Sequence, residues 1–417
     1  MIPTLPLALY GAATAMLEPF APLVLRGRAR RGKEDTARLS ERLGRAGVPR
    51  PDGGLVWLHG VSVGEATSLL PLVAGLLTRR PDLAILVTSG TVTAAAMLAR
   101  RLPDGVLHQF APVDTPGAVR RFLDHWRPDA AVFVESELWP NLIAAARARG
   151  VRLALVSARM TQASAQRWGR WAASARALLG AFELILPQDE ATEARLRSLG
   201  AALGSHVNLK RVGEPLPFDP DALNRMRDAA GRRSVVLAAS THEGEEEIIA
   251  DAFRRALRDP DEALLVIAPR HPGRGGRLRT LLNAHSRSAN EPPTGAVYLA
   301  DTLGELGLFF RLADVVVMGG SFVPGIGGHN PLEPARIGRP ILTGPDTFNA
   351  ADVYAEMFAE TCAIEASDAT TLARHIRGLL DNPAIARRMG EAAAGYAQRQ
   401  GAALDRALAL IEPLLPA

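Results

Sequence analysis

Strand-like and helix-like segments alternate along almost the whole chain. Short apolar runs rich in Val, Ile and Leu are each followed by a longer amphipathic segment rich in Ala, Arg and Leu. This alternation predicts parallel βαβ units, whose helices cover both faces of a sheet. The runs of a first series are Leu55–Val61, Leu83–Thr88, Val106–Ala111, Ala130–Glu135, Arg152–Val156 and Phe182–Leu186. Those of a second series are Val235–Ala238, Leu264–Ala268, Val297–Leu299, Val315–Met318 and Pro340–Leu342.

The two series predict two doubly wound α/β domains. At 417 residues the chain is too long for one ordinary hydrophobic core. The proline-containing segment 213–231 separates the series and is the candidate linker. We therefore expect one Rossmann-like domain over residues 31–212 and another over residues 232–417, facing each other across a cleft. Ligands should bind at the carboxyl ends of the strands.

Residues 1–30 form a candidate membrane anchor. From Ile2 to Leu25 only Glu18 is charged, although four prolines interrupt the run and make it a marginal span. No positive residue precedes the run, which argues against a secretory signal. A basic collar follows, consisting of Arg26, Arg28, Arg30, Arg31 and Lys33. Such a collar is expected on the cytoplasmic side and attracts anionic lipid, whereas the alternative is a buried N-terminal helix of a soluble protein.

Composition narrows the classes of function. The net charge of +4 and the pI of about 9.7 suit an anionic surface or substrate, but no basic platform interleaved with aromatics supports nucleic-acid binding. The single cysteine, Cys362, excludes a disulfide framework and a thiolate metal cluster. The chain contains no G-x-S-x-G nucleophile motif. We expect no metal, since no ligand spacing connects His59, His242, His271 and His329.

Carboxylates follow two strands of the first series. Glu65 stands where a helix begins after the first strand and would point into the cleft, as a general base for a sugar hydroxyl should. The alternative is that Glu65 only complements the helix dipole. Glu135 and Glu137 follow another strand, where they could act as acid and base, although Trp139-Pro140 also fits a packed helix start.

A glycine-rich turn between Met318 and Phe348 is the candidate nucleotide site. Asn330 suits the helix N-cap and Pro331 the first helical position, so free backbone donors and the helix dipole should attract a phosphate. Glu333 could accept hydrogen bonds from ribose hydroxyls. Alternatively, Glu333 only complements the dipole and the glycines only build a tight turn.

Two further segments of the second series carry charge. Ser240-Thr241-His242-Glu243 fits a capping box, with Glu245–Glu247 as an acidic first turn. Arg270 ends a strand with a cation suited to a phosphate, and an exposed ion pair is the alternative.

Together these segments resemble the 3-deoxy-D-manno-octulosonic acid (Kdo) transferases of Gram-negative bacteria. The matching motifs are RRGKED at Arg30–Asp35, HGVSVGE at His59–Glu65, VESELWPN at Val134–Asn141, SARM at Ser157–Met160, NLK at Asn208–Lys210, ASTHEGEEE at Ala239–Glu247, PRHP at Pro269–Pro272 and GGSFVPGIGGHNPLEP at Gly319–Pro334. Three departures are visible. Ser136 and Ser157 stand where the family usually has threonine and asparagine, and the segment 211–215 differs from the usual NLKFD ending.

The resemblance implies a GT-B glycosyltransferase with two Rossmann-like domains and an N-terminal membrane-anchoring segment. It implies inverting transfer of Kdo from CMP-Kdo to a lipid A precursor of the lipid IVA type in lipopolysaccharide biosynthesis, without metal or cofactor, at the cytoplasmic face of the inner membrane. Glu65 would be the base, and Glu135 and Lys210 would stabilise the transition state. The implied CMP-binding residues are Pro269, Arg270, Met318, Gly319, Gly320, Asn330, Pro331, Leu332 and Glu333. The alternatives are a GT-B enzyme that uses a UDP-sugar, as a transferase or an epimerase, and a non-catalytic membrane-bound protein that binds a nucleotide-sugar or a lipid.

Overall fold

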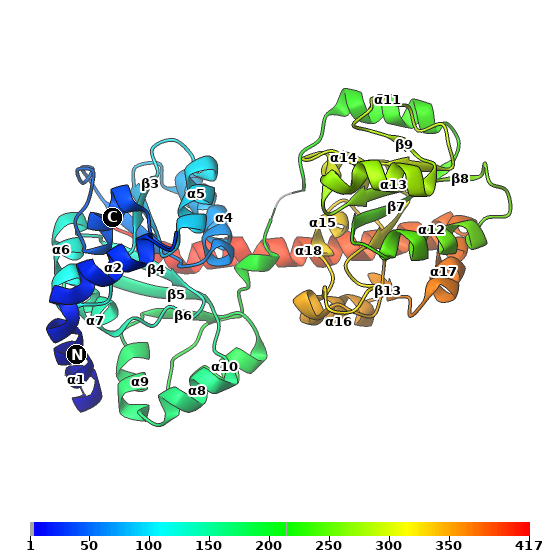
Figure 1. Cartoon of the computed structure of the whole chain (residues 1–417). Coiled ribbons are helices and arrows are strands. Elements are labelled where there is room, and N and C mark those ends of the chain that lie inside the picture. The colour runs from blue at the N-terminus through cyan, green and yellow to red at the C-terminus, as the bar shows by residue number, and fades with distance from the viewer. Residues whose placement is uncertain (1–3, 214) are drawn as a thin grey trace. The chain divides into compact units, whose positions relative to one another are not determined.

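The computed structural model describes residues 4–213 and 215–417, and the chain divides into two compact units. The first unit is Met1–Gly213 together with Gln400–Ala417, and the second is Glu214–Arg399. Each unit is built around its own parallel sheet (Figure 1).

The sheet of the first unit has six strands in the order β3-β2-β1-β4-β5-β6, and every described pairing in it is parallel. The strands are β1 (Leu55–His59), β2 (Ala84–Ser89), β3 (Leu107–Phe110), β4 (Ala130–Val134), β5 (Arg152–Ala158) and β6 (Leu184–Pro187). Trp57 in β1 lies opposite Leu86 in β2 and Ala131 in β4. The strand order reverses between β1 and β4, which is where doubly wound sheets bind ligands.

Helices cover both faces of this sheet, because alternate side chains of the buried strands point to opposite sides. One face packs on α4 (Val63–Arg79), α5 (Val92–Arg101) and the last part of α18 (Pro383–Ile411). The other face packs on α6 (Pro116–Trp126), α7 (Pro140–Ala148), α9 (Ala172–Leu179) and α10 (Glu190–Ser198). The short helix α8 (Gln162–Gly169) packs against α9.

The N-terminal apolar segment is helical and lies on the first unit. It consists of α1 (Leu5–Leu17), the 3-10 turn η1 (Glu18–Phe20) and α2 (Ala21–Ala29), and Figure 1 shows it in blue beside α6 and α7. By length and composition alone, Leu5–Ala29 is able to cross a membrane, with a mean hydropathy of 1.3. Its apolar window is not buried, which corrects the alternative of a buried core helix. Pro6, Pro19 and Pro22 stand at helix starts, where a proline is tolerated, and do not break the segment.

Polar contacts fasten this segment to the rest of the first unit. The Tyr10 hydroxyl donates to Asp114 Oδ2 at 2.9 Å, and Glu18 Oε2 accepts from the Gly117 amide at 2.7 Å. After α2, the turn η2 (Thr36–Arg38) and helix α3 (Leu39–Arg42) lead toward β3, where Glu41 Oε2 accepts from the Phe110 amide at 2.8 Å. The N-terminal helices therefore have a defined place on this unit.

The sheet of the second unit has seven strands in the order β13-β12-β11-β7-β8-β10-β9, again parallel in every described pairing. The strands are β7 (Ser234–Thr241), β8 (Ala263–Pro269), β9 (His285–Ser286), β10 (Val297–Leu299), β11 (Val315–Met318), β12 (Ile341–Thr343) and β13 (Ala363–Glu365). One face packs on α11 (Pro220–Ala230), α14 (Leu306–Leu312), α15 (Leu332–Ala335), α16 (Ala351–Ala359) and the first part of α18. The other packs on α12 (Glu245–Ala256), α13 (Gly275–Leu282) and α17 (Ala369–Asp381).

The structure differs from the expected domain boundaries at two places. The second part of the expected linker 213–231 is helix α11, because Pro220 occupies its first turn and the Asp219 carboxylate caps it by accepting from the amides of Asp221 and Ala222. Leu223 and Met226 of α11 belong to the core of the second unit. Residues 400–417, expected in the second domain, instead complete the core of the first unit.

Candidate active site

Glu65 lies at the start of α4, after the turn that follows β1. It closes a capping box, in which Ser62 Oγ accepts from the Glu65 amide at 3.3 Å and Glu65 Oε2 accepts from the Val61 amide at 2.6 Å and the Ser62 amide at 3.3 Å. The other oxygen, Oε1, makes no hydrogen bond to the described residues. The helix-capping alternative and the predicted base are therefore compatible, because one oxygen holds the helix start and the other is able to accept a proton.

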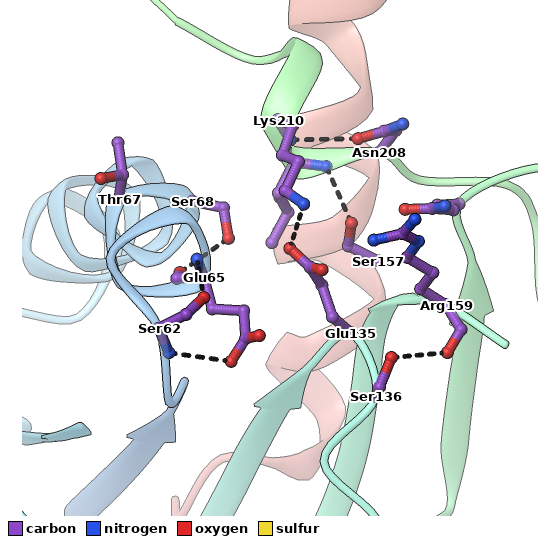
Figure 2. Close-up of polar contacts among 12 residues, drawn as sticks. Ser62, Glu65, Thr67, Ser68, Glu135, Ser136, Ser157, Arg159, Asn208 and Lys210 are labelled. Carbon is purple, nitrogen blue, oxygen red and sulfur yellow. Dashed lines mark hydrogen bonds and ion pairs between the residues drawn. The ribbon is translucent and has the colours of Figure 1, made fainter. Parts of the chain in front are cut away.

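Glu135 follows β4, the hydrogen-bonded neighbour of β1, and pairs with Lys210. Lys210 Nζ lies 2.7 Å from Glu135 Oε1, and the Glu135 side chain is only 5% exposed, whereas that of Lys210 is 43% exposed. Figure 2 shows Glu65, Glu135 and Lys210 gathered at the same edge of the first sheet. The structure thus brings together all three of the residues for which a role in the chemistry is expected.

The backbone is strained at two positions around this ion pair. Glu135 has φ 59° and Ser157, at a bulge in β5, has φ 54°. A left-handed residue with a side chain costs roughly 1–2 kcal/mol, and such strain gathers at functional sites. Ser157 Oγ accepts from the Leu209 amide at 3.3 Å, and the Asn208 side chain accepts from the Lys210 amide at 3.1 Å (Figure 2). The strained bulge therefore helps to hold the turn η3 (Leu209–Arg211), which carries Lys210.

Glu137 does not join the candidate catalytic group. Its Oε2 accepts from Trp139 Nε1 and lies 3.8 Å from His59 Nε2. Helix α7 begins at Pro140, so the segment after Glu135 builds a helix start. The geometry thus favours the alternative of a packed helix start over an acid–base pair of Glu135 and Glu137.

In the second unit, Glu245 holds the glycine-rich turn. This carboxylate is fully buried at the start of α12, where Oε2 accepts from the amides of Gly320 at 2.7 Å and His242 at 2.8 Å. Its Oε1 accepts from the amides of Ser321 at 2.8 Å and Phe322 at 2.9 Å. The amides of Gly320, Ser321 and Phe322 are therefore occupied by a carboxylate of the chain itself. The donors predicted to attract a phosphate belong to the helix start near Asn330, and their binding of a phosphate stays a prediction.

Two local expectations in this unit need correction. The expected capping box at Ser240–Glu243 is absent from the described contacts, because α12 begins at Glu245 with Gly244 as its N-cap. Helix α15 begins at Leu332, one residue later than expected, with Asn330 Oδ1 accepting from the Leu332 amide at 3.0 Å. The polar side chain of Asn330 still satisfies a donor at the helix start.

The expected nucleotide residues lie around the ends of β8 and β11. Pro269 ends β8 and Arg270 follows it in an exposed position, while Met318 ends β11 and Gly319 and Gly320 follow it. Gly319 is in close backbone contact with β7, because an added Cβ would lie 2.7 Å from Ser240 O. Burial raises the pKa of Glu333, while the charges of Arg336 and Arg270 oppose this rise.

Two histidines that lie far apart in the chain meet beside this turn, a contact that no local pattern predicts. His242 Nε2 lies 2.9 Å from His329 Nε2, and the rings stack 5.1 Å apart. Burial, followed by the neighbouring His242 and Arg270, lowers the pKa of His329 to about 4. Over the described ranges 4–213 and 215–417, no group of three or more His, Cys, Asp or Glu side chains is placed to hold a metal ion.

Comparison with known proteins decides the family. The family model described as "3-Deoxy-D-manno-octulosonic-acid transferase (kdotransferase)" matches residues 37–211. The 3-deoxy-D-manno-octulosonic acid transferase of Bordetella pertussis is 36% identical over 436 residues, which cover 97% of this chain and 99% of that protein. The chain belongs to the Kdo transferase family. It is therefore a glycosyltransferase.

Another Kdo transferase relative comes from Arabidopsis thaliana and is named "Probable 3-deoxy-D-manno-octulosonic acid transferase, mitochondrial". It is 38% identical over 352 residues, covering 81% of this chain and 79% of that protein. Among solved structures, a glycosyltransferase from Rickettsia africae is 11% identical, covers 87% of this chain and 99% of that chain, and gives a TM-score of 0.57. The predicted GT-B fold class of this Kdo transferase, with two parallel α/β sheets, is thereby confirmed.

Proposed function

We propose that this Kdo transferase moves Kdo from CMP-Kdo to a lipid A precursor, with inversion at the anomeric carbon and without a metal. The observation that carries the proposal is the position of Glu65 beside the Glu135–Lys210 ion pair at the point where the strand order of the first sheet reverses. The second unit would bind the nucleotide and the first unit the acceptor.

The reaction balances with the residues of this chain. Glu65 Oε1 would accept the proton of the acceptor hydroxyl as the oxygen forms its bond to the anomeric carbon of Kdo. The bond between that carbon and the CMP phosphate would break, and its electron pair would leave with CMP. Lys210 would supply a positive charge for the developing negative charge, and Arg270 would supply another for the leaving phosphate.

The N-terminal helices support a place at the inner membrane, on its cytoplasmic face. Leu5, Leu9, Met16, Leu17, Phe20, Leu23 and Val24 are exposed on this segment. The exposed basic residues Arg26, Arg30, Arg31 and Lys33 come directly after them. An apolar helical face followed by cations suits an anionic membrane surface, where a lipid acceptor would be found.

The decisive experiment compares Glu65→Gln with wild type. Glutamine retains an oxygen for the amides of Val61 and Ser62, so the helix start stays capped while the base is lost. We expect kcat to fall by about 10²–10⁴ while CMP-Kdo binding is retained. Thr67→Ala, at an exposed position on the same turn of α4, is the control and should leave turnover unchanged. Unchanged turnover in Glu65→Gln would show that Glu65 is not the base.

A second experiment tests the donor by mass analysis of the lipid product formed with CMP-Kdo and with a UDP-sugar. Product formed only from the UDP-sugar would show that CMP-Kdo is not the donor.

A further inference from the structure

A groove of about 620 Å³ opens on the first unit between the N-terminal helices and the carboxyl ends of β1, β2 and β3. Leu17, Phe20 and Val24 form part of one wall, and Trp139 and Leu142 lie among the other lining residues. The volume is that of a small-molecule site, and the lining is mainly apolar. Covering the apolar part of this lining by an apolar ligand would be favourable.

Apolar side chains line the groove and remain exposed to solvent. The side chains of Leu17, Phe20 and Val24 line the groove and are still 62%, 57% and 59% exposed. Two hydrogen bonds hold this segment on the unit, from the Tyr10 hydroxyl of α1 to Asp114 and from the Gly117 amide to Glu18 of η1. The segment therefore holds the groove open, with its apolar side chains available to a ligand.

His59 supplies a second, independent indication of a ligand. It lines the groove, is 1% exposed, and Nδ1 lies 2.8 Å from Thr88 Oγ1. Thr88 Oγ1 accepts from Trp57 Nε1 and donates to Leu58 O at 3.5 Å, so its contact with Nδ1 is compatible with either tautomer of the imidazole. This buried Nε2 makes no hydrogen bond to the described residues, and the Glu137 Oε2 oxygen beside it lies 3.8 Å away, beyond hydrogen-bond distance. An unsatisfied buried polar atom is unfavourable, and a polar group of a ligand would satisfy it.

The charges around the groove favour an anionic head group. Arg28 and Arg42 both line the groove, and both pair with the single carboxylate of Glu34, at 2.7 Å and 3.3 Å. Asp114 also lines the groove, but Tyr10 OH and the amides of Asn141 and Leu142 donate to its carboxylate, and burial raises its pKa. The exposed basic collar adds further positive charge nearby in the sequence.

We propose that this groove binds a fatty acyl chain of the acceptor lipid, with His59 Nε2 hydrogen-bonded to a polar group at the head-group end of that chain. The inference rests on the proposed function, since it identifies the acceptor's acyl chain as the occupant. Val61 connects the two sites, because it lines the groove while its amide donates to Glu65 Oε2 at 2.6 Å. A chain held in the groove therefore brings the lipid head group to the Glu65 turn.

The proposal is tested by a substitution on α2 that places a bulky side chain in the groove. Ala21 is a half-buried lining residue on α2, and Leu23 on the same helix is exposed and does not line the groove. We expect Ala21→Trp to raise KM for the acylated acceptor by at least about tenfold, or 1.4 kcal/mol, without changing KM for CMP-Kdo or for a deacylated acceptor with the same head group. Leu23→Trp, which adds a similar apolar group, should change none of these values. Equal effects of the two variants on KM for the acylated acceptor would show that the acyl chain acts through membrane association alone. This result would contradict the proposal that the groove binds the acyl chain.

A second measurement does not depend on catalysis. A photoreactive long-chain fatty acid should label the wild-type full chain on peptides that contain Phe20–Arg28 or Ala111–Thr115, and Ala21→Trp should abolish this labelling. Labelling confined to other peptides would overturn the proposal even if Kdo transfer were observed. Labelling of the groove without any Kdo transfer would retain the acyl site and reject the proposed function, so the two failures are distinguishable.

Discussion

Lys210 Nζ and Glu135 Oε1 lie 2.7 Å apart, with the carboxylate buried and the ammonium partly exposed. Lys210 and Lys33 are the only lysines among the 48 basic residues of the chain. A compact ammonium concentrates its charge on one atom, whereas a guanidinium spreads it over a planar fork. The pair therefore neutralises a buried carboxylate and leaves one face of the lysine accessible to a substrate.

The first prediction concerns this pair. Lys210→Met leaves the Glu135 carboxylate buried without its cation, and we expect it to destabilise the protein by about 1–2 kcal/mol, a value reduced because Lys210 is partly exposed. Transfer should slow by at least about tenfold because a charge near the transition state is lost. Thermal unfolding and steady-state rates measure the two effects.

A double-mutant cycle provides the control for this prediction. Glu135→Gln combined with Lys210→Met should cost less stability than the sum of the single changes, since no unpaired charge remains. Arg152→Met, which removes a more exposed pair with Glu183 in the same unit, should change stability by no more than about 0.5 kcal/mol. Additive effects of Glu135→Gln and Lys210→Met would show that the pair is not coupled.

The second prediction concerns Glu245. Glu245→Gln would place an NH₂ group against two of the backbone amides that now donate to the carboxylate. We expect a loss of about 2–4 kcal/mol in the stability of the second unit and weaker binding of CMP, because the turn would no longer be fixed. Urea unfolding and calorimetric titration with CMP measure these changes. Glu243→Gln, at an exposed pair with Arg277, is the matched control. If both variants unfold at the same urea concentration, Glu245 does not organise the turn.

The third prediction is a loss of stability in mild acid. His329 has its pKa lowered to about 4 by burial and by His242, and burial with Arg38 lowers the pKa of His108 in the first unit to about 4. An unfolded histidine titrates near 6.5, so between about pH 6.5 and 4 the unfolded chain binds protons that the folded chain does not. Stability should therefore be complete above this window and fall as the pH drops through it.

Urea unfolding at a series of pH values tests the third prediction, with two histidine variants as mutual controls. His329→Gln should flatten the pH dependence of the second unit, and His108→Gln should flatten only that of the first. The two units contain separate cores, so their transitions are followed with probes in each unit. An unchanged pH slope in both variants would contradict the assigned cause.

The strands were predictable because each main strand is buried on both faces and therefore reads as an apolar run between turns. The short edge strands β9 (His285–Ser286) and β13 (Ala363–Glu365) escaped prediction, because neither sequence, HS or AIE, is an apolar run. The local pattern does not predict helix α11, because Pro220 suits a linker as well as the helix start that it occupies. Local sequence does not show that residues 400–417 return to the first core, since that depends on contacts far apart in the chain.

In the candidate active site, too, local features were predictable and long-range contacts were not. The position of Glu65 followed from the strand and turn before it. The resemblance pointed to Glu135 and Lys210, but their contact joins residues far apart in sequence and only the structure reveals it. Glu245 was interpreted as an ordinary acidic helix start, because the turn that it holds lies some 75 residues away. Its neighbour Glu246, also fully buried, was likewise indistinguishable until its contact with Arg274 was seen.

Helix α18 has a consequence for how the protein is made. Its residues Ala403, Ala407, Leu408 and Ile411 belong to the core of the first unit, although they follow the whole second unit in the chain. During translation the second unit has all of its residues by Arg399, while the face of the first sheet under α4 and α5 still lacks one of its covering helices. Domains usually fold in the order of their synthesis. In this protein the first unit, although synthesised first, completes its core last. The first unit therefore exposes part of its apolar core until residues 400–417 have been synthesised.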